Sequence, residues 1–236
     1  MIEWFATAWY WNIQEVYLNI ISQKNKSLNY MSLHVINHPV ATHALTILRD
    51  KTSTMAQFRD ACNSVVPCVI YEATKNLQLK DREIETPICK TTGKDMKNDV
   101  VVIPILRAGI SMLPSTLSFL PFAKVGYFGM VRDEKTAVAS TYYNKIPPIE
   151  GTDVLVIDPM LATGGSSAYV IEELLKKNPR SLSLCSIVAA PEGAKLLNDK
   201  FPNVAVYTLA LDEKLNDKKY IVPGLGDFGD RFHGTV

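Results

Sequence analysis

Cysteine is scarce in this chain of 236 residues. Its four copies are scattered, with no C-x-x-C spacing among them. This pattern does not fit a structural zinc site and suggests no disulfide framework. The first residues also lack the basic start and the small-residue cleavage site of a secretion signal. We therefore expect reduced thiols and a cytoplasmic location.

A net charge of either sign is also missing. Lys and Arg number 25 against 24 Asp and Glu, which leaves a formal charge of +1. This balance gives no overall attraction to nucleic acid or to an acidic membrane, and we expect neither as a partner. The chain has no run of roughly 20 apolar residues, so we expect no transmembrane span. Its hydrophobic content of 47% and charged content of 21% are typical of a soluble globular protein.

The first 31 residues differ from the rest, because they contain all three tryptophans of the chain. We treat residues 1–31 as an N-terminal extension of unknown role and residues 32–236 as the main domain. Several interpretations of the extension remain. It is an interfacial or partner-binding helix, a helix packed on the body, or a segment outside the native reading frame, with Met31 as the alternative start.

Five short apolar runs, rich in β-branched residues, indicate strands that are buried on both faces of a parallel sheet. Helical patterns lie between them, at residues 166–178 and 190–202. Alternation of this kind predicts an α/β fold with a mostly parallel sheet flanked by helices. Residues 34–77 read as largely helical, and residues 142–152 as a proline-rich surface excursion. The five predicted strands are residues 100–106, 123–131, 153–159, 182–190 and 204–211.

Near the C-terminus, residues 224–229 read GLGDFG and match the dinucleotide fingerprint G-x-G-x-x-G. That fingerprint needs a following helix, a second strand and an acidic residue about 20 positions further on. The given sequence ends at Val236, and Pro223 precedes the first glycine. We therefore do not expect a dinucleotide site, and these glycines and aspartates need another explanation.

The strongest chemical signal follows the predicted strand at residues 153–159. Asp158 ends the apolar run, and a loop of glycines and hydroxyls at residues 159–166 leads into a helix. Glycines let backbone N–H groups approach an anion closely, and the helix N-terminus favours negative charge. Asp158 can accept hydrogen bonds from sugar hydroxyls. No lysine follows the glycines, so this is not a Walker A loop.

The segment DPMLATGGS at residues 158–166 resembles the phosphoribosyl diphosphate (PRPP) motif of type I phosphoribosyltransferases. The form with proline at position 159 is similar to that of uracil phosphoribosyltransferases. Five further segments resemble the same family in the same order: HPVATHALTILRDKTS, YEATKNL, ETPICKTTGK, VIPILRAG and VPGLGDFGDR. The resemblance covers residues 34–235 and implies a type I phosphoribosyltransferase fold with a small base-binding hood.

The resemblance implies transfer of phosphoribose from PRPP to N1 of uracil, which yields UMP and pyrophosphate. It places uracil among Ile221, Gly226, Asp227 and Phe228, where Phe228 replaces a residue that is often alanine. Asp227, Arg107 and Arg132 are the expected catalytic residues, although either arginine could instead be a solvated surface charge. The residues expected to bind PRPP are Arg107, Arg132, Asp158, Pro159, Met160, Leu161, Ala162, Thr163, Gly164, Gly165, Ser166 and Asp227.

The resemblance also implies a cofactor and partners. Mg²⁺ is expected on the substrate diphosphate, with no dedicated cluster of protein ligands. GTP is a candidate activator, for which Arg49 and Lys51 in residues 48–53 form a candidate site, and a solvent-facing basic pair is the alternative. We expect a homodimer or homotetramer, and a mobile flap after Arg132.

Two other functions use the same fold. A regulatory RNA-binding protein needs a basic face, which the charge balance does not indicate, and Pro159 also argues against it because such proteins usually keep an acidic pair there. An enzyme for another base, such as a purine or cytosine, is the second alternative. The hood at residues 221–228 resembles the uracil type.

Overall fold

The computed structural model describes residues 32–132 and 139–235. The interpretations of residues 1–31 lie outside this part of the chain. The flap predicted after Arg132 begins at residues 133–138, which also lie outside the described part.

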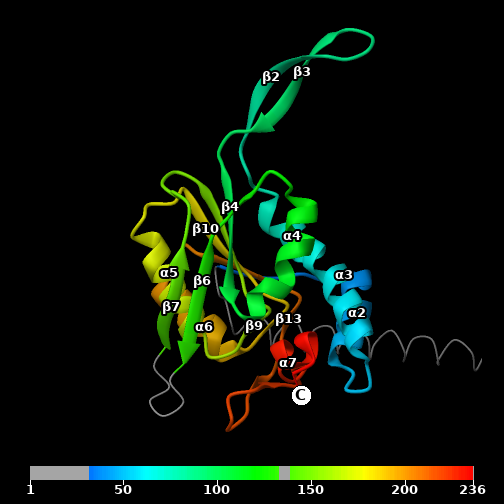
Figure 1. Ribbon diagram of the computed structural model, residues 1–236, viewed down its shortest axis with the longest axis vertical. Coiled ribbons are helices and arrows are strands. Elements are labelled where there is room, and N and C mark those ends of the chain that lie inside the picture. Colours follow the sequence, from blue (N-terminus) through cyan, green and yellow to red (C-terminus); the bar gives the residue numbers. More distant parts are fainter. Residues whose placement is uncertain (1–31, 133–138, 236) are drawn as a thin grey trace, which may run out of the picture. The chain divides into compact units, whose positions relative to one another are not determined.

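The body is built on one mostly parallel sheet, as predicted (Figure 1). Its strand order is β1-β12-β10-β8-β4-β6-β7, and only β7 runs antiparallel to its neighbour. A short strand, β5 (Lys124–Val125), pairs with β4 at one side. The others are β1 (Leu33–Val35), β12 (Ala205–Thr208), β10 (Ser181–Cys185), β8 (Asp153–Ile157), β4 (Val100–Leu106), β6 (Tyr127–Arg132) and β7 (Ala139–Lys145).

Helices cover both faces of this sheet, which explains why its central strands are apolar throughout. Alternate residues of a strand point to opposite faces. Val100 and Val102 of β4 accordingly join one core, while Val101 and Ile103 join the other. The first core contains α2 (Pro39–Arg49), α3 (Met55–Thr74) and α4 (Leu113–Phe119), and the second contains α5 (Gly165–Leu175) and α6 (Pro191–Lys200).

Residues 34–77 were predicted to be largely helical, and α2 and α3 confirm this for most of the segment. The prediction is wrong for its first two residues. Residues 33–35 form β1, because they pair with β12 at the edge of the sheet. Helix α3 begins with a capping box: the hydroxyl of Thr54 accepts from the N–H of Gln57, whose side chain accepts from the N–H of Thr54. This reciprocal cap explains the sharp break between the two helices.

Two of the predicted strands, residues 182–190 and 204–211, are each divided between two sheets. Beyond β8, β10 and β12 the chain continues into a second parallel sheet of three short strands, in the order β13-β11-β9. These strands are β9 (Met160–Leu161), β11 (Val188–Ala189) and β13 (Ala210–Leu211). The apolar pattern continues from β10 into β11 and from β12 into β13, so the sequence reads as one strand where the structure has two.

Two antiparallel hairpins complete the fold. The first, β2 (Leu79–Glu85) with β3 (Lys90–Met96), was not predicted and projects away from the sheet (Figure 1). The second, β14 (Lys214–Leu215) with β15 (Ile221–Val222), precedes the glycine segment. The predicted excursion at residues 142–152 is wrong at its beginning, which lies in β7. It is also wrong at Ile149, which is 1% exposed.

None of the helices in the described residues is long and apolar enough to cross a membrane.

Candidate active site

The predicted site residues follow three neighbouring strands at the carboxyl edge of the large sheet. Arg107 comes directly after β4, Asp158 comes directly after β8, and Arg132 is the last residue of β6. These strands are parallel neighbours, with Pro104 beside Ile157 in the register. Ligands of α/β proteins bind at this edge. Only the backbone of Arg132 is described, so its side-chain role stays a prediction.

The glycine loop after β8 is more ordered than predicted. Residues 159–166 were predicted as loop, but β9 occupies Met160 and Leu161, and α5 already begins at Gly165. Gly164 caps the helix with φ 78°, a left-handed conformation that favours glycine. No acidic residue lies in the first turn of α5, so its N-terminus can receive an anion without competition from a carboxylate.

Helix α6 supports this loop from behind. A Cβ on Gly193 would lie 2.4 Å from the carbonyl oxygen of Ala162, and a Cβ on Gly164 would lie 3.1 Å from the Cα of Gly193. Only glycine permits so close an approach of two backbones. Gly193 therefore supports the loop in a way that we did not predict, since nothing in its local sequence indicates this contact.

Asp158 is half-buried at the start of the loop. Burial raises the pKa of its carboxyl group to about 7, although the hydrogen bond from the N–H of Met160 opposes this shift. The N–H of Asp158 donates to the carbonyl of Cys185 at 3.1 Å and so anchors the residue to the adjacent strand. This bond fixes the backbone of Asp158 at the carboxyl edge of the sheet.

Arg107 lies at the turn between β4 and the 3-10 helix η1 (Ala108–Met112), and its side chain is exposed. The peptide between Leu106 and Arg107 is cis. The turn rests against the end of β8, because a Cβ on Gly109 would lie 2.4 Å from the carbonyl oxygen of Ile157. This close contact holds the arginine turn beside the Asp158 loop.

The predicted base loop runs from β15 to α7 (Phe228–His233). Ile221 is buried, and the peptide between Val222 and Pro223 is cis. Gly226 is exposed with φ 82°. Asp227 is exposed and caps α7, since its Oδ1 accepts from the N–H of Asp230 at 2.9 Å. The loop thus offers backbone groups and one carboxylate to a ligand.

Phe228 directs its ring away from the solvent. It is 2% exposed and packs against Phe58 and Phe232, with ring centroids 5.0 and 6.0 Å away. The large residue at this position therefore fills the core beneath the loop.

The base loop and the arginine turn are neighbours, since α7 contacts both η1 and α3. Figure 1 shows α7 toward the end of the sheet where β4 ends. The structure therefore brings three sequence motifs, separated by up to 120 residues, to one edge.

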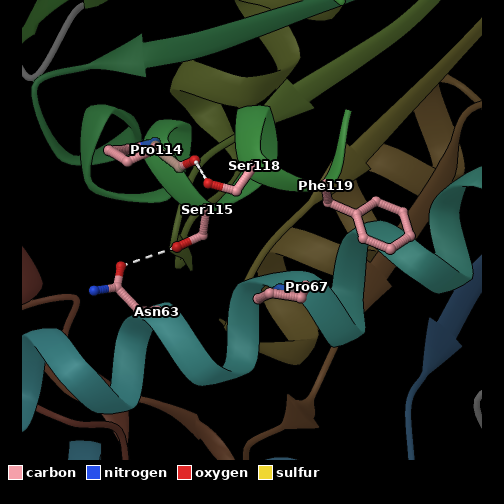
Figure 2. Close-up of a pocket in the computed structure, with 6 residues that line it drawn as sticks. All are labelled: Asn63, Pro67, Pro114, Ser115, Ser118 and Phe119. Atoms are coloured by element: carbon pink, nitrogen blue, oxygen red, sulfur yellow. Dashed lines mark hydrogen bonds between the residues drawn. The ribbon is translucent and has the colours of Figure 1, made fainter. Parts of the chain in front are cut away.

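A surface groove between α3 and α4 is lined by none of the residues predicted to bind PRPP or uracil. It has a volume of about 520 Å³ and is lined by Asn63, Pro67 and Phe119 among others (Figure 2). Ser115 donates to Asn63 across it at 2.9 Å. Within the described residues, no group of three or more His, Cys, Asp or Glu side chains could hold a metal ion.

The candidate GTP segment has a different environment from the one expected. Arg49 is neither a free cation nor a solvent-facing one, because its guanidinium binds Asp212 and the carbonyl of Gly224. Lys51 is exposed. A triphosphate at residues 48–53 would therefore meet one lysine and an engaged arginine.

The parallel sheet carries a phosphate loop (residues 158–166) after β8 and an arginine turn after β4, and a C-terminal hood (residues 221–228) lies apart from it. This arrangement is that of a type I phosphoribosyltransferase. The family model described as uracil phosphoribosyltransferase matches residues 35–235. The chain belongs to this family.

Similar proteins carry the name of the same family. The uracil phosphoribosyltransferase of Finegoldia magna is 49% identical over 203 residues, which cover 85% of this chain and 97% of that protein. The enzyme of the same name from Lacticaseibacillus paracasei is 48% identical with the same coverage. Among solved structures, the AQ2163 protein from Aquifex aeolicus matches with a TM-score of 0.82 at 37% identity, over 85% of this chain and 97% of that one.

Proposed function

We propose that the chain transfers the 5-phosphoribosyl group of PRPP to N1 of uracil at the carboxyl edge of the sheet, and releases UMP and pyrophosphate. One observation carries the assignment of the site. The phosphate loop, the arginine turn and the base loop, far apart in the sequence, converge on this edge.

The glycine loop binds the 5′-phosphate in this proposal. Backbone N–H groups at the start of α5 and the hydroxyls of Thr163 and Ser166 donate to the phosphate, and the helix dipole favours its charge. Asp158 accepts from the ribose hydroxyls. These contacts hold the sugar while its C1 atom exchanges the diphosphate for the base.

Arg107 and Arg132 act on the leaving group. Positive charge develops on the ribose and negative charge on the diphosphate as the C1–O bond breaks, so fixed cations at the diphosphate lower the barrier. A planar guanidinium binds two phosphate oxygens at once, which a lysine cannot do. Members of the wider enzyme class generally use Mg²⁺ with PRPP. The ion neutralises charge on the diphosphate, and the protein contribution that we propose is the carboxylate of Asp227.

The base loop selects uracil through backbone groups of Gly226, Asp227 and Phe228, above the buried side chain of Ile221. Uracil offers two carbonyl acceptors and one N3–H donor. Cytosine would place an amino group against a backbone donor, and a site of this kind rejects such an analogue by about 10⁴- to 10⁵-fold. Asp227 is the candidate group for removing the N1 proton of uracil.

The test is an assay of the purified protein with PRPP and Mg²⁺, in which uracil, cytosine, hypoxanthine and orotate are offered separately. We expect UMP from uracil and no nucleotide from the other bases. Product from a purine would refute the assignment of the base. No product from any base, with or without GTP, would refute the enzyme and favour the RNA-binding alternative.

The same assay addresses activation. We propose GTP as an activator at residues 48–53. A rate increase by GTP that the Lys51→Ala variant loses would support this site. A GTP response that Lys51→Ala keeps would contradict the location, and the absence of any response would contradict the activator.

We also propose that the chain forms a homodimer or homotetramer through the β2–β3 hairpin. All seven residues of β2 are exposed, and Ile88 at the hairpin turn is 93% exposed. An apolar tip on a projecting hairpin is stable in water when another chain covers it. Light scattering of the wild type and of the Ile84→Lys, Ile88→Lys double variant tests this, and an unchanged mass for the variant would refute it.

The remaining proposals concern boundaries and location. The family match begins at residue 35 and β1 begins at Leu33, which supports a catalytic domain at residues 32–236 after an extension at residues 1–31. All four cysteines are free thiols, in keeping with a reducing, cytoplasmic setting. A variant that begins at Met31 and keeps full activity would support the boundary, and loss of activity would contradict it. Fractionation of the source cells, with the protein in the cytosolic fraction, checks the location.

A further inference from the structure

Gly224, the first glycine of the base loop, is held at both of its polar backbone atoms. Its N–H donates to Oδ2 of Asp212 at 2.9 Å, and its carbonyl accepts from Nη1 of Arg49 at 2.7 Å. Arg49 also binds both carboxylate oxygens of Asp212, at 2.6 and 2.9 Å. The three residues therefore form a closed set of hydrogen bonds around the backbone of Gly224, which we call the Gly224 clamp.

The clamp is largely shielded from water. The side chain of Asp212 is 4% exposed and that of Arg49 is 25% exposed. Gly224 has φ 60°, and a Cβ there would lie 2.1 Å from the carbonyl oxygen of Ile221. The position thus admits glycine alone, and a glycine without the clamp would leave the loop free to take other conformations.

The clamp connects the base loop to the phosphate loop. Asp212 directly follows β13, and its N–H donates to the carbonyl of Ala189 in β11 at 2.8 Å. Strand β11 pairs in turn with β9, which opens the phosphate loop. Asp212 is therefore fixed to the same small sheet that carries Met160 and Leu161. The clamp thus links the position of the base loop to that of the phosphate loop.

Arg231 fixes the next peptide from the other side. Its guanidinium donates to the carbonyl of Leu225 at 2.7 Å and to that of Asp50 at 2.6 Å, and also binds the carbonyl of Leu48. It lies 4.5 Å from the ring centroid of Phe58. The end of α2 thus supports residues 224 and 225, immediately before the residues assigned to uracil.

We propose that Arg49 and Asp212 are positioning residues for the base: together they orient the Gly224–Gly226 backbone that meets uracil, without touching the substrate. This inference rests on the proposed assignment of that loop to uracil. An ion pair can instead serve stability alone. What distinguishes this pair is that both partners also bind Gly224.

The test compares two ion pairs of the same kind in the full-length protein. Asp212→Asn and Arg49→Lys weaken the clamp. Asp153→Asn and Arg180→Lys weaken a matched pair, with Asp153 3% and Arg180 30% exposed, at the amino end of β8. We expect the clamp variants to raise the KM for uracil by about 10- to 100-fold, with kcat and the KM for PRPP changed by less than about 3-fold. The matched variants should leave all three unchanged.

If the matched variants change the KM for uracil as much as the clamp variants do, the ion pair has only a general structural role and the proposal is overturned. The same holds if the clamp variants raise the KM for uracil and the KM for PRPP equally. Gly226→Ala separates this failure from a wrong assignment of the loop. If Gly226→Ala raises the KM for uracil and the clamp variants do not, the positioning role is refuted and the loop assignment stands. If neither changes it, both are refuted. Thermal unfolding confirms that each variant is folded, and Arg49→Lys carries the test alone if Asp212→Asn does not fold.

Discussion

Gly193 offers a sharp test of how the phosphate loop is held, because it lies outside every recognised motif. In Gly193→Ala, the new Cβ would lie 2.4 Å from the carbonyl oxygen of Ala162, whereas ordinary contacts begin at 3.4 Å. One of the two backbones must therefore move by about 1 Å. Helix α6 is fixed by the buried side chains of Ala194 and Leu197, so we expect the loop to move.

A misplacement of about 1 Å at a site that positions a reacting group costs roughly 100-fold in rate. We accordingly expect kcat/KM for PRPP to fall about 100-fold in Gly193→Ala. Initial rates at varied PRPP and saturating uracil measure this quantity. Gly151→Ala is the control, since it places a Cβ at φ 68° with nothing within 4 Å. An unchanged kcat/KM for PRPP in a folded Gly193→Ala protein would refute the bracing of the loop by α6.

Three further predictions follow from the site. The pKa of Asp158 rises from 3.8 to about 7 on folding, so the folded state binds its proton more tightly than the unfolded state. The unfolding free energy of the wild type should therefore fall relative to that of Asp158→Asn as the pH rises from about 4 to about 7. Denaturant unfolding that gives the same difference between the two proteins at every pH would contradict this. Phe228→Ala removes a buried ring and should cost about 3 kcal/mol of unfolding free energy while leaving the preference for uracil over cytosine intact, because the ring does not face the base; a changed preference in the base-panel assay would place the ring in the pocket. Arg107→Lys keeps the charge but loses the two-pronged contact, and kcat/KM for PRPP should fall by about 10- to 100-fold; wild-type kinetics would show that Arg107 does not contact the diphosphate.

Much of this molecule was predictable because its signals are local. The run at residues 100–106 matches β4 at both ends, since a strand buried on both faces is apolar throughout. The glycine loop at residues 159–166 is likewise a continuous segment, and its small residues mark its position in the sequence. The order of the motifs along the chain was enough to expect the fold.

The parts that were missed depend on contacts between distant residues. Arg49 and Asp212 are 163 positions apart, so the ion pair between them was not predicted. The orientation of Phe228 depends on Phe58 of α3, which no local pattern indicates. The β2–β3 hairpin was missed for the opposite reason, because its strands are exposed on both faces and leave no periodic apolar signal.

The division of three strands between two sheets restricts how the family can vary in length. Each of β8, β10 and β12 continues into a strand of the small sheet after one or two residues. Because side chains alternate along a strand, an inserted or deleted residue at these junctions would exchange the buried and outward faces of the following strand. It would also shift the residues that follow, among them Asp212. Insertions and deletions should therefore be absent from these junctions in members of the family. They should accumulate instead in the β2–β3 hairpin, whose exposed strands impose no such restriction.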